Sequence, residues 1–75
     1  MLPLAMIAEG ENVQLVNIIG GRVLRKRLAD LGLSPGMSLK VVQADPHGPI
    51  ILAVKDSRIA LGRGMAQKVM VELIA

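Results

Sequence analysis

The stretch GGRVLRKRLADLGLSPGM, residues 20–37, decides the fold because it combines a chain break, a helix and a tight turn. Its leucines recur at the spacing of one helical face, which predicts a helix over residues 22–31. The opposite face is strongly basic. The apolar face consists of Leu24, Leu28 and Leu31, widened by Val23, and the basic residues are Arg22, Arg25, Lys26 and, at the margin of the face, Arg27.

The end of this helix is marked by a glycine and followed by a proline-glycine turn. Gly32 is expected just after the last helical residue, because glycine readily takes the positive φ found at many helix ends. Leu33 is then predicted to fold back onto the last helical turn. Residues 34–37 predict a tight turn, since Pro35 holds φ at about −65° and Gly36 permits a left-handed residue.

Short apolar segments on both sides of the helix predict the strands of a small sheet. Residues 12–18 and 38–44 alternate in part between apolar and polar side chains, as half-buried strands do. Residues 49–55 are almost entirely apolar, which indicates a central strand. Further strands are expected at 3–7, 58–61 and 69–74, with a loop at 45–48, a two-residue hairpin turn at Asp56-Ser57 and a short helical turn at 62–68.

Five or six short strands with one helix after the second predict a mainly β domain that occupies residues 1–75 as a single unit. Closing such a sheet into a barrel removes unpaired strand edges, which in so apolar a chain would invite aggregation. An SH3-like barrel fits this order of elements best. An OB-type barrel is the rival, although its helix usually comes later in the chain. Strict alternation places Val13 and Leu15 on one face of the second strand and Val16 and Ile18 on the other.

The composition argues against a reactive centre. The chain contains no aromatic residue and no cysteine, so it offers no stacking surface for single-stranded nucleic acid and no thiolate metal site. Its one histidine, His47, lies close to Asp45, but two ligands do not make a transition-metal site. None of the serines lies in a nucleophile motif, and the spacing of a phosphate-binding loop is missing. We therefore expect no catalytic residue, no metal site and no cofactor.

The apolar N-terminal segment predicts a strand and not a targeting sequence. It lacks a basic leader and meets Glu9 and Glu11 almost at once. No apolar run approaches the ~18 residues required to span a bilayer. The absence of cysteine also fits a reducing compartment. We therefore expect a cytoplasmic protein that does not insert into a membrane.

Four motifs follow one another along the chain in the order found in one known family. Residues 27–36, RLADLGLSPG, match the pattern R-L-x-x-L-G-[LI]-x-P-G. Residues 13–21 form a strand that ends in glycines, residues 45–50 read DPHGPI, and residues 59–66 read IALGRGMA. Together they resemble FeoA, the ferrous iron transport protein A family, and a similar domain ends the iron-dependent repressors of the DtxR type. The signature implies that Arg27, Leu28, Leu31, Gly32, Pro35 and Gly36 form the structural motif.

The resemblance implies a non-catalytic accessory protein of ferrous iron uptake, whose partner is FeoB, the membrane transporter. The residues themselves point to two features of a binding surface. Arg22, Arg25 and Lys26 are suited to steer an acidic partner, although a solvated helix face is the simpler interpretation. The excess of apolar residues predicts a patch between helix and barrel, with Val23 or Leu33 part-exposed. In this interpretation Leu28 and Leu31 anchor the helix.

Two alternatives stay open at the level of sequence. An SH3-like regulatory domain of a metal-responsive transcription regulator, or a nucleic-acid-binding module, would use the same fold. Scattered acidic residues and the lack of aromatics weigh against nucleic acid, which is not expected as a partner. Weak self-association is left open.

Overall fold

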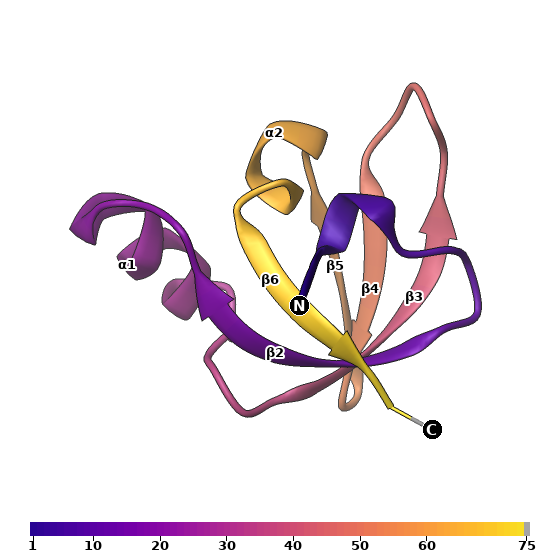
Figure 1. The fold of residues 1–75 in the computed structure, drawn as a ribbon, viewed down its shortest axis with the longest axis horizontal. Coiled ribbons are helices and arrows are strands. Elements are labelled where there is room, and N and C mark those ends of the chain that lie inside the picture. Colours follow the sequence, from indigo (N-terminus) through magenta and orange to yellow (C-terminus); the bar gives the residue numbers. More distant parts are fainter. Residues whose placement is uncertain (75) are drawn as a thin grey trace.

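A computed structural model, in which residues 1–74 are described, shows a strongly curved antiparallel sheet with one main helix at its end (Figure 1). The strands lie in the order β1-β6-β2-β3-β4-β5. This confirms the prediction of a mainly β barrel with a helix after the second strand. The elements are β1 (Leu2–Pro3), the 3-10 helix η1 (Leu4–Met6), β2 (Asn12–Ile18), α1 (Arg22–Asp30), β3 (Ser38–Ala44), β4 (Ile50–Val54), β5 (Ser57–Leu61), α2 (Arg63–Ala66) and β6 (Val69–Leu73).

The core inside the curved sheet is built from aliphatic side chains. Among residues 1–74 no polar or charged residue is buried. An aliphatic side chain stabilises the fold by about 1.5–3 kcal/mol when it is fully buried. To bury them all without voids, the side chains of neighbouring elements interdigitate closely. The completely buried large side chains are Leu4, Leu15, Leu28, Leu33, Ile50, Leu52, Leu61, Val13, Val41, Val69 and Val71.

A bulge in β2 changes which side chains face this core. Leu15 lies opposite Val71 and Asn17 lies opposite Met70, so Val16 is an extra residue in β2. An inserted residue moves every later side chain to the other face of the strand. Ile18 is consequently buried, and the prediction that it faces away from Leu15 was wrong.

The N-terminal segment departs from the predicted strand over residues 3–7. Only Leu2 and Pro3 pair with β6, and the chain then turns into η1. The turn brings Leu4 into the core, where it is completely buried. η1 lies beside α2, at the top of the view in Figure 1.

The hairpin between β4 and β5 turns one residue earlier than predicted. Ser57 pairs with Val54, so the two turn residues are Lys55 and Asp56. Lys55 adopts the left-handed conformation, with φ 53°. The expected turn at Asp56-Ser57 is therefore wrong by one residue, because the register of the two strands places it at Lys55-Asp56.

The end of α1 follows the prediction from its glycine. Gly32 has φ 90° and its N–H donates to the carbonyl of Ala29 at 2.9 Å, while the Leu33 N–H donates to the carbonyl of Leu28 at 2.9 Å. This pair of hydrogen bonds is the Schellman arrangement, in which the residue after the glycine returns to the last helical turn. The following turn is also confirmed, because Gly36 has φ 96° and the Met37 N–H reaches the Ser34 carbonyl at 3.3 Å.

Alanine at position 32 should weaken this helix end. We expect Gly32→Ala to lower the free energy of unfolding by about 1–2 kcal/mol, because a β-carbon disfavours the left-handed conformation. Gly62 serves as the matched control, since it has φ −63° and an added β-carbon there meets no atom within 4 Å. Urea denaturation followed by circular dichroism measures both variants. Equal stabilities would contradict the proposed role of Gly32.

Candidate functional site

The predicted site residues lie on or directly after α1, which projects from one end of the barrel (Figure 1). Leu28 is completely buried and Leu24 packs partly buried against the core, so these two side chains attach the helix. Leu31 is 44% exposed and Val23 is 76% exposed. The exposure of Val23 agrees with the predicted apolar patch. The prediction that Val23 widens the helix face packed on the barrel was wrong, and so was the prediction that Leu31 anchors the helix.

Leu33 lies in the core and not at the surface. It is completely buried, because the glycine cap returns it to the end of α1, whose carbonyl at Leu28 accepts its N–H. The inward-facing leucine after the helix is therefore Leu33, two residues beyond Leu31. This burial corrects the choice of Leu33 as a partner-contacting residue.

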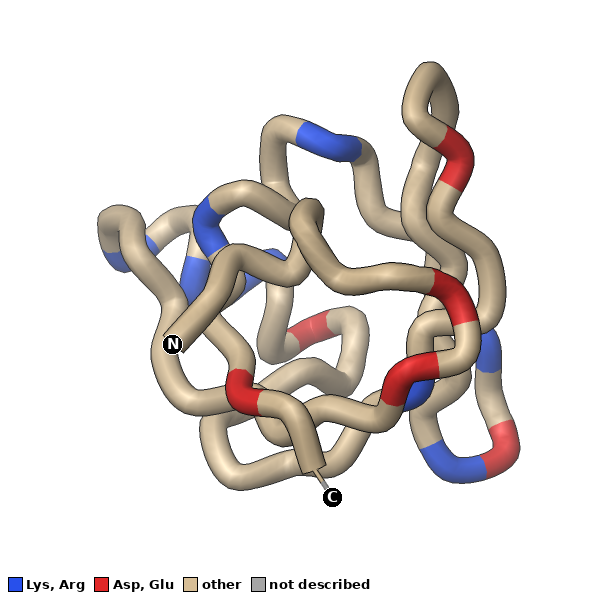
Figure 2. The backbone as a smooth tube through the Cα atoms, turned by 45° about the vertical axis from the view of Figure 1, so that its right-hand side comes forward, with Lys and Arg blue, Asp and Glu red and all other residues tan. Residues whose placement is uncertain are grey.

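The positive charge of the protein is concentrated in α1. This helix contains four of the nine Lys and Arg residues and one of the six Asp and Glu residues. The five basic and five acidic residues elsewhere balance, so the formal net charge of +3 lies in α1. In Figure 2 several blue segments lie on the α1 side of the molecule, whereas blue and red segments are mixed on the other side of the barrel.

Few contacts within the chain neutralise these basic side chains. The one salt bridge among residues 1–74 joins Lys26 and Asp30 at 3.1 Å, and both side chains are largely exposed. Arg25 donates from Nε to the carbonyl of Gly20 at 3.4 Å. The first turn of α1 holds no acidic residue and no side-chain cap, although a helix start favours negative charge. The arrangement therefore adds little to helix stability and leaves the cations available to another molecule.

We call Arg22, Val23, Arg25 and Lys26 the α1 surface. All four are exposed, and Ile19, just before the helix, is 55% exposed. The surface combines three cations with an apolar side chain, which suits contact with an acidic, partly apolar protein face. Its four side chains include no nucleophile and no acid–base pair.

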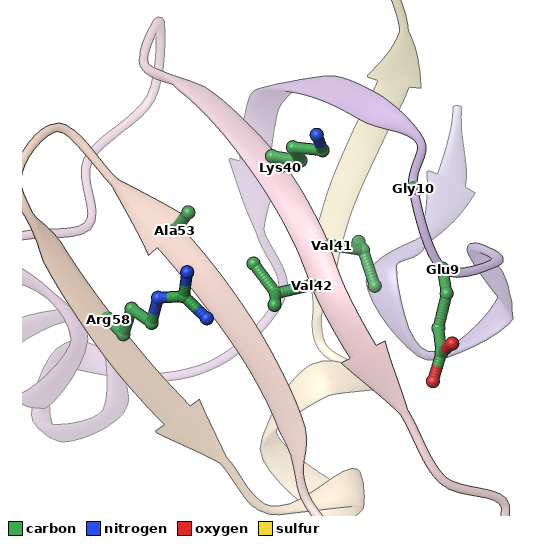
Figure 3. Close-up of a pocket in the computed structure, with 7 residues that line it drawn as sticks. All are labelled: Glu9, Gly10, Lys40, Val41, Val42, Ala53 and Arg58. Carbon is green, nitrogen blue, oxygen red and sulfur yellow. The ribbon is translucent and has the colours of Figure 1, made fainter.

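A shallow hollow of about 470 Å³ lies on the outer face of the sheet (Figure 3). Lys40 of β3, Ala53 of β4 and Arg58 of β5 lie opposite one another in the register of these strands, so their side chains share one face. No local sequence pattern points to Lys40 or Arg58, because only the register brings them into one row. The hollow is lined by Glu9, Gly10, Lys40, Val41, Val42, Ala53 and Arg58.

Arg63 ties three segments together near α2. Its Nε donates to the carbonyl of Asp45 at 2.9 Å, its Nη2 donates to the same oxygen, and its Nη1 donates to the carbonyl of Ala5 at 3.2 Å. The side chain thereby fixes the β3–β4 loop and η1 against α2. The sequence marked Arg63 only as part of a motif, because its acceptors are backbone oxygens that no residue type reveals.

The loop that contains the only histidine is held by local hydrogen bonds. The Asp45 carboxylate accepts the N–H of His47 at 2.9 Å, an arrangement typical of a loop turn. No group of three or more His, Cys, Asp or Glu side chains in the described part of the chain is placed to hold a metal ion. None of the helices in residues 1–74 is long and apolar enough to cross a membrane.

Comparison with known proteins identifies relatives that match almost the whole chain. The FeoA domain model matches residues 2–73. A putative Fe(2+) transport protein A of Methanocaldococcus jannaschii is 44% identical over 72 residues, covering 96% of this chain and 87% of the relative. A fusion of Fe(2+) transport protein A with the Fe(2+) transporter FeoB, from Porphyromonas gingivalis, is 33% identical over 73 residues. That match covers 96% of this chain but only 9% of the fusion protein.

Solved structures share the fold. The crystal structure of an iron uptake regulatory protein (FeoA) superposes with a TM-score of 0.92 and 40% identity, covering 97% of each chain. A manganese-dependent transcriptional repressor superposes with a TM-score of 0.87 over 96% of this chain and 41% of the repressor; at 22% identity this shows a common fold alone. These findings confirm the SH3-like fold and the resemblance carried by the four sequence motifs, and the chain therefore belongs to the FeoA family of ferrous iron transport proteins.

Proposed function

We propose that this protein is a non-catalytic cytoplasmic accessory protein of ferrous iron transport, which binds the cytoplasmic part of a FeoB-like transporter through the α1 surface. The observation that carries the proposal is the concentration of the net charge on one exposed helix. Arg22 and Arg25 belong to this helix and form no salt bridge with a carboxylate among the described residues. An acidic surface on the partner would neutralise them.

The identity of the partner is supported by the fusion protein of Porphyromonas gingivalis. Its name places a protein of the FeoA type and a FeoB transporter in one chain. Joining two domains by a linker raises their effective concentration and makes even a weak contact between them persistent. Where a protein of the FeoA type and a FeoB-like transporter are separate chains, their interface has to form without a linker. The positive charge of α1 would promote this contact.

The charge and the apolar side chain act at different stages of binding. The cations act at long range and raise the rate of encounter with an acidic surface. Val23 acts only on contact, where its removal from water stabilises the complex by about 1–2 kcal/mol. To regulate transport, the protein has to bind one conformation of the transporter more tightly than another, because equal affinity for both shifts no population.

A co-purification experiment tests this function. The immobilised protein should retain the FeoB-like transporter of its own organism from a detergent extract at low salt and release it as the salt concentration rises. Screening of exposed charges causes the release. Absence of retention at low salt, or retention that does not respond to salt, would contradict docking through the α1 surface.

A further inference from the structure

No strand among residues 1–74 pairs with the outer edge of β5. β5 is the last strand in the sheet order and pairs only with β4. The two-residue turn makes Val54 and Ser57 a hydrogen-bonded pair, so every second residue of β5 directs its N–H and carbonyl away from β4. These residues are Arg58 and Ala60. Neither forms a backbone hydrogen bond outside the sheet among residues 1–74, and within the sheet β5 pairs with β4 alone.

The two edges of the sheet differ in how they are protected. At the other edge, β1 consists of two residues, and one of them is Pro3, which has no N–H to offer. β5 has five residues and no proline, and Arg58 is the only charged side chain along it. A charged residue discourages pairing with a like-charged edge, but it leaves the edge open to a segment of opposite charge.

A groove of about 380 Å³ runs between this edge and α1. Leu31 is 44% exposed and Met65 is half-buried there, so the groove offers apolar surface that nothing in the described chain covers. A strand edge with a helix alongside is a common arrangement for holding an extended peptide. The groove is lined by Arg27, Asp30, Leu31, Ala60, Leu61 and Met65.

The two faces next to the edge differ in chemistry. On the outer face lies Arg58, with Lys40 in the same row about 10 Å away across two strands. Figure 3 shows both side chains beside Ala53, and neither forms a salt bridge with a carboxylate among residues 1–74. On the inner face lie Ile59, half-buried, and Leu61, buried. Successive side chains of an added strand would meet these two faces in turn.

We propose that the β5 edge accepts an extended segment of a partner protein as an additional strand, and that this segment alternates acidic and apolar residues. Its backbone bonds to Arg58 and Ala60. Its acidic side chains face Arg58 and Lys40, and its apolar side chains extend the core toward Leu31 and Met65. This interaction surface is separate from the α1 surface and does not depend on the function proposed above.

A short peptide of alternating Glu and Val, blocked at both ends, is the probe. Added to the intact protein, it should slow hydrogen exchange of the Arg58 and Ala60 amides, measured by NMR, about tenfold or more, since each gains a hydrogen bond. A Lys-Val peptide of the same length should leave both amides unchanged. Equal protection by the two peptides, or protection of other amides only, would overturn the proposal.

Ala60→Pro provides the decisive variant. Proline removes the outward-directed N–H, and an edge position of this kind tolerates it without loss of the sheet. We expect the variant to keep its NMR spectrum away from β5 and to bind the Glu-Val peptide about tenfold more weakly. Unchanged affinity would overturn strand addition. A protein with Arg25→Ala and Lys26→Ala should still bind the peptide, so loss of transporter binding and loss of peptide binding are distinguishable.

Discussion

Replacing Leu33 by alanine is expected to lower the free energy of unfolding by about 3 kcal/mol, the largest single effect on stability that we predict. Leu33 is completely buried and lies at the point where the glycine cap joins α1 to the barrel. Truncation leaves a cavity that the neighbouring aliphatic chains fill only in part. A domain of this size is marginally stable, so urea denaturation should show a large fall in the midpoint.

Leu31→Ala is the matched control for this experiment. Leu31 is the same residue type two positions earlier, but 44% of its surface is exposed. Its truncation should cost less than about 1 kcal/mol, because little of the side chain leaves the core. Comparing the two variants distinguishes the stability contributed by the buried Leu33 from that contributed by the exposed Leu31. A larger loss for Leu31→Ala than for Leu33→Ala would contradict the burial of these two leucines.

A variant with Arg25→Ala and Lys26→Ala should associate with the cytoplasmic part of the transporter about tenfold more slowly at low salt. Both side chains belong to the helix that carries the net charge. The variant also loses the exposed Lys26–Asp30 pair, which stabilises the helix by at most about 0.5 kcal/mol, so the fold should be retained. Stopped-flow or surface-binding kinetics over a range of salt concentrations would measure the change.

Removing two positive charges from the barrel gives the corresponding control. Lys40→Ala with Lys55→Gly lowers the net charge by the same amount while leaving α1 intact, and glycine suits the left-handed conformation of residue 55. Its association rate should fall much less than that of the α1 variant. If both variants slow association equally, the total charge matters and its location does not.

Local signals in the sequence were sufficient for the main elements. The helix α1, Gly32 after it and the Pro35-Gly36 turn each depend on a few neighbouring residues, and the structure confirms all three, although Leu31 of the predicted apolar face is exposed. The order of strands then limited the architecture to a small barrel. Propensity and periodicity predict such elements well because the physical causes lie within one turn or one strand.

Features that depend on distant segments were not predictable in this way. The bulge at Val16 forms against β6, and only this pairing explains why Ile18 is buried. Arg63 bonds to the carbonyl of Ala5, 58 residues away along the chain. Similarly, the choice between Leu31 and Leu33 as the core residue depends on the direction of the chain after the cap. The row formed by Lys40 and Arg58 requires the register of three strands.

The uneven distribution of charge also gives the molecule a permanent electric dipole. Its positive end is α1, and the rest of the chain has no formal net charge. Near any anionic surface, including the acidic headgroups of an inner membrane leaflet, the field exerts a torque that turns this end toward the surface before contact. A protein that approaches a transporter embedded in such a leaflet would therefore arrive already rotated, and fewer encounters would be lost to wrong orientations.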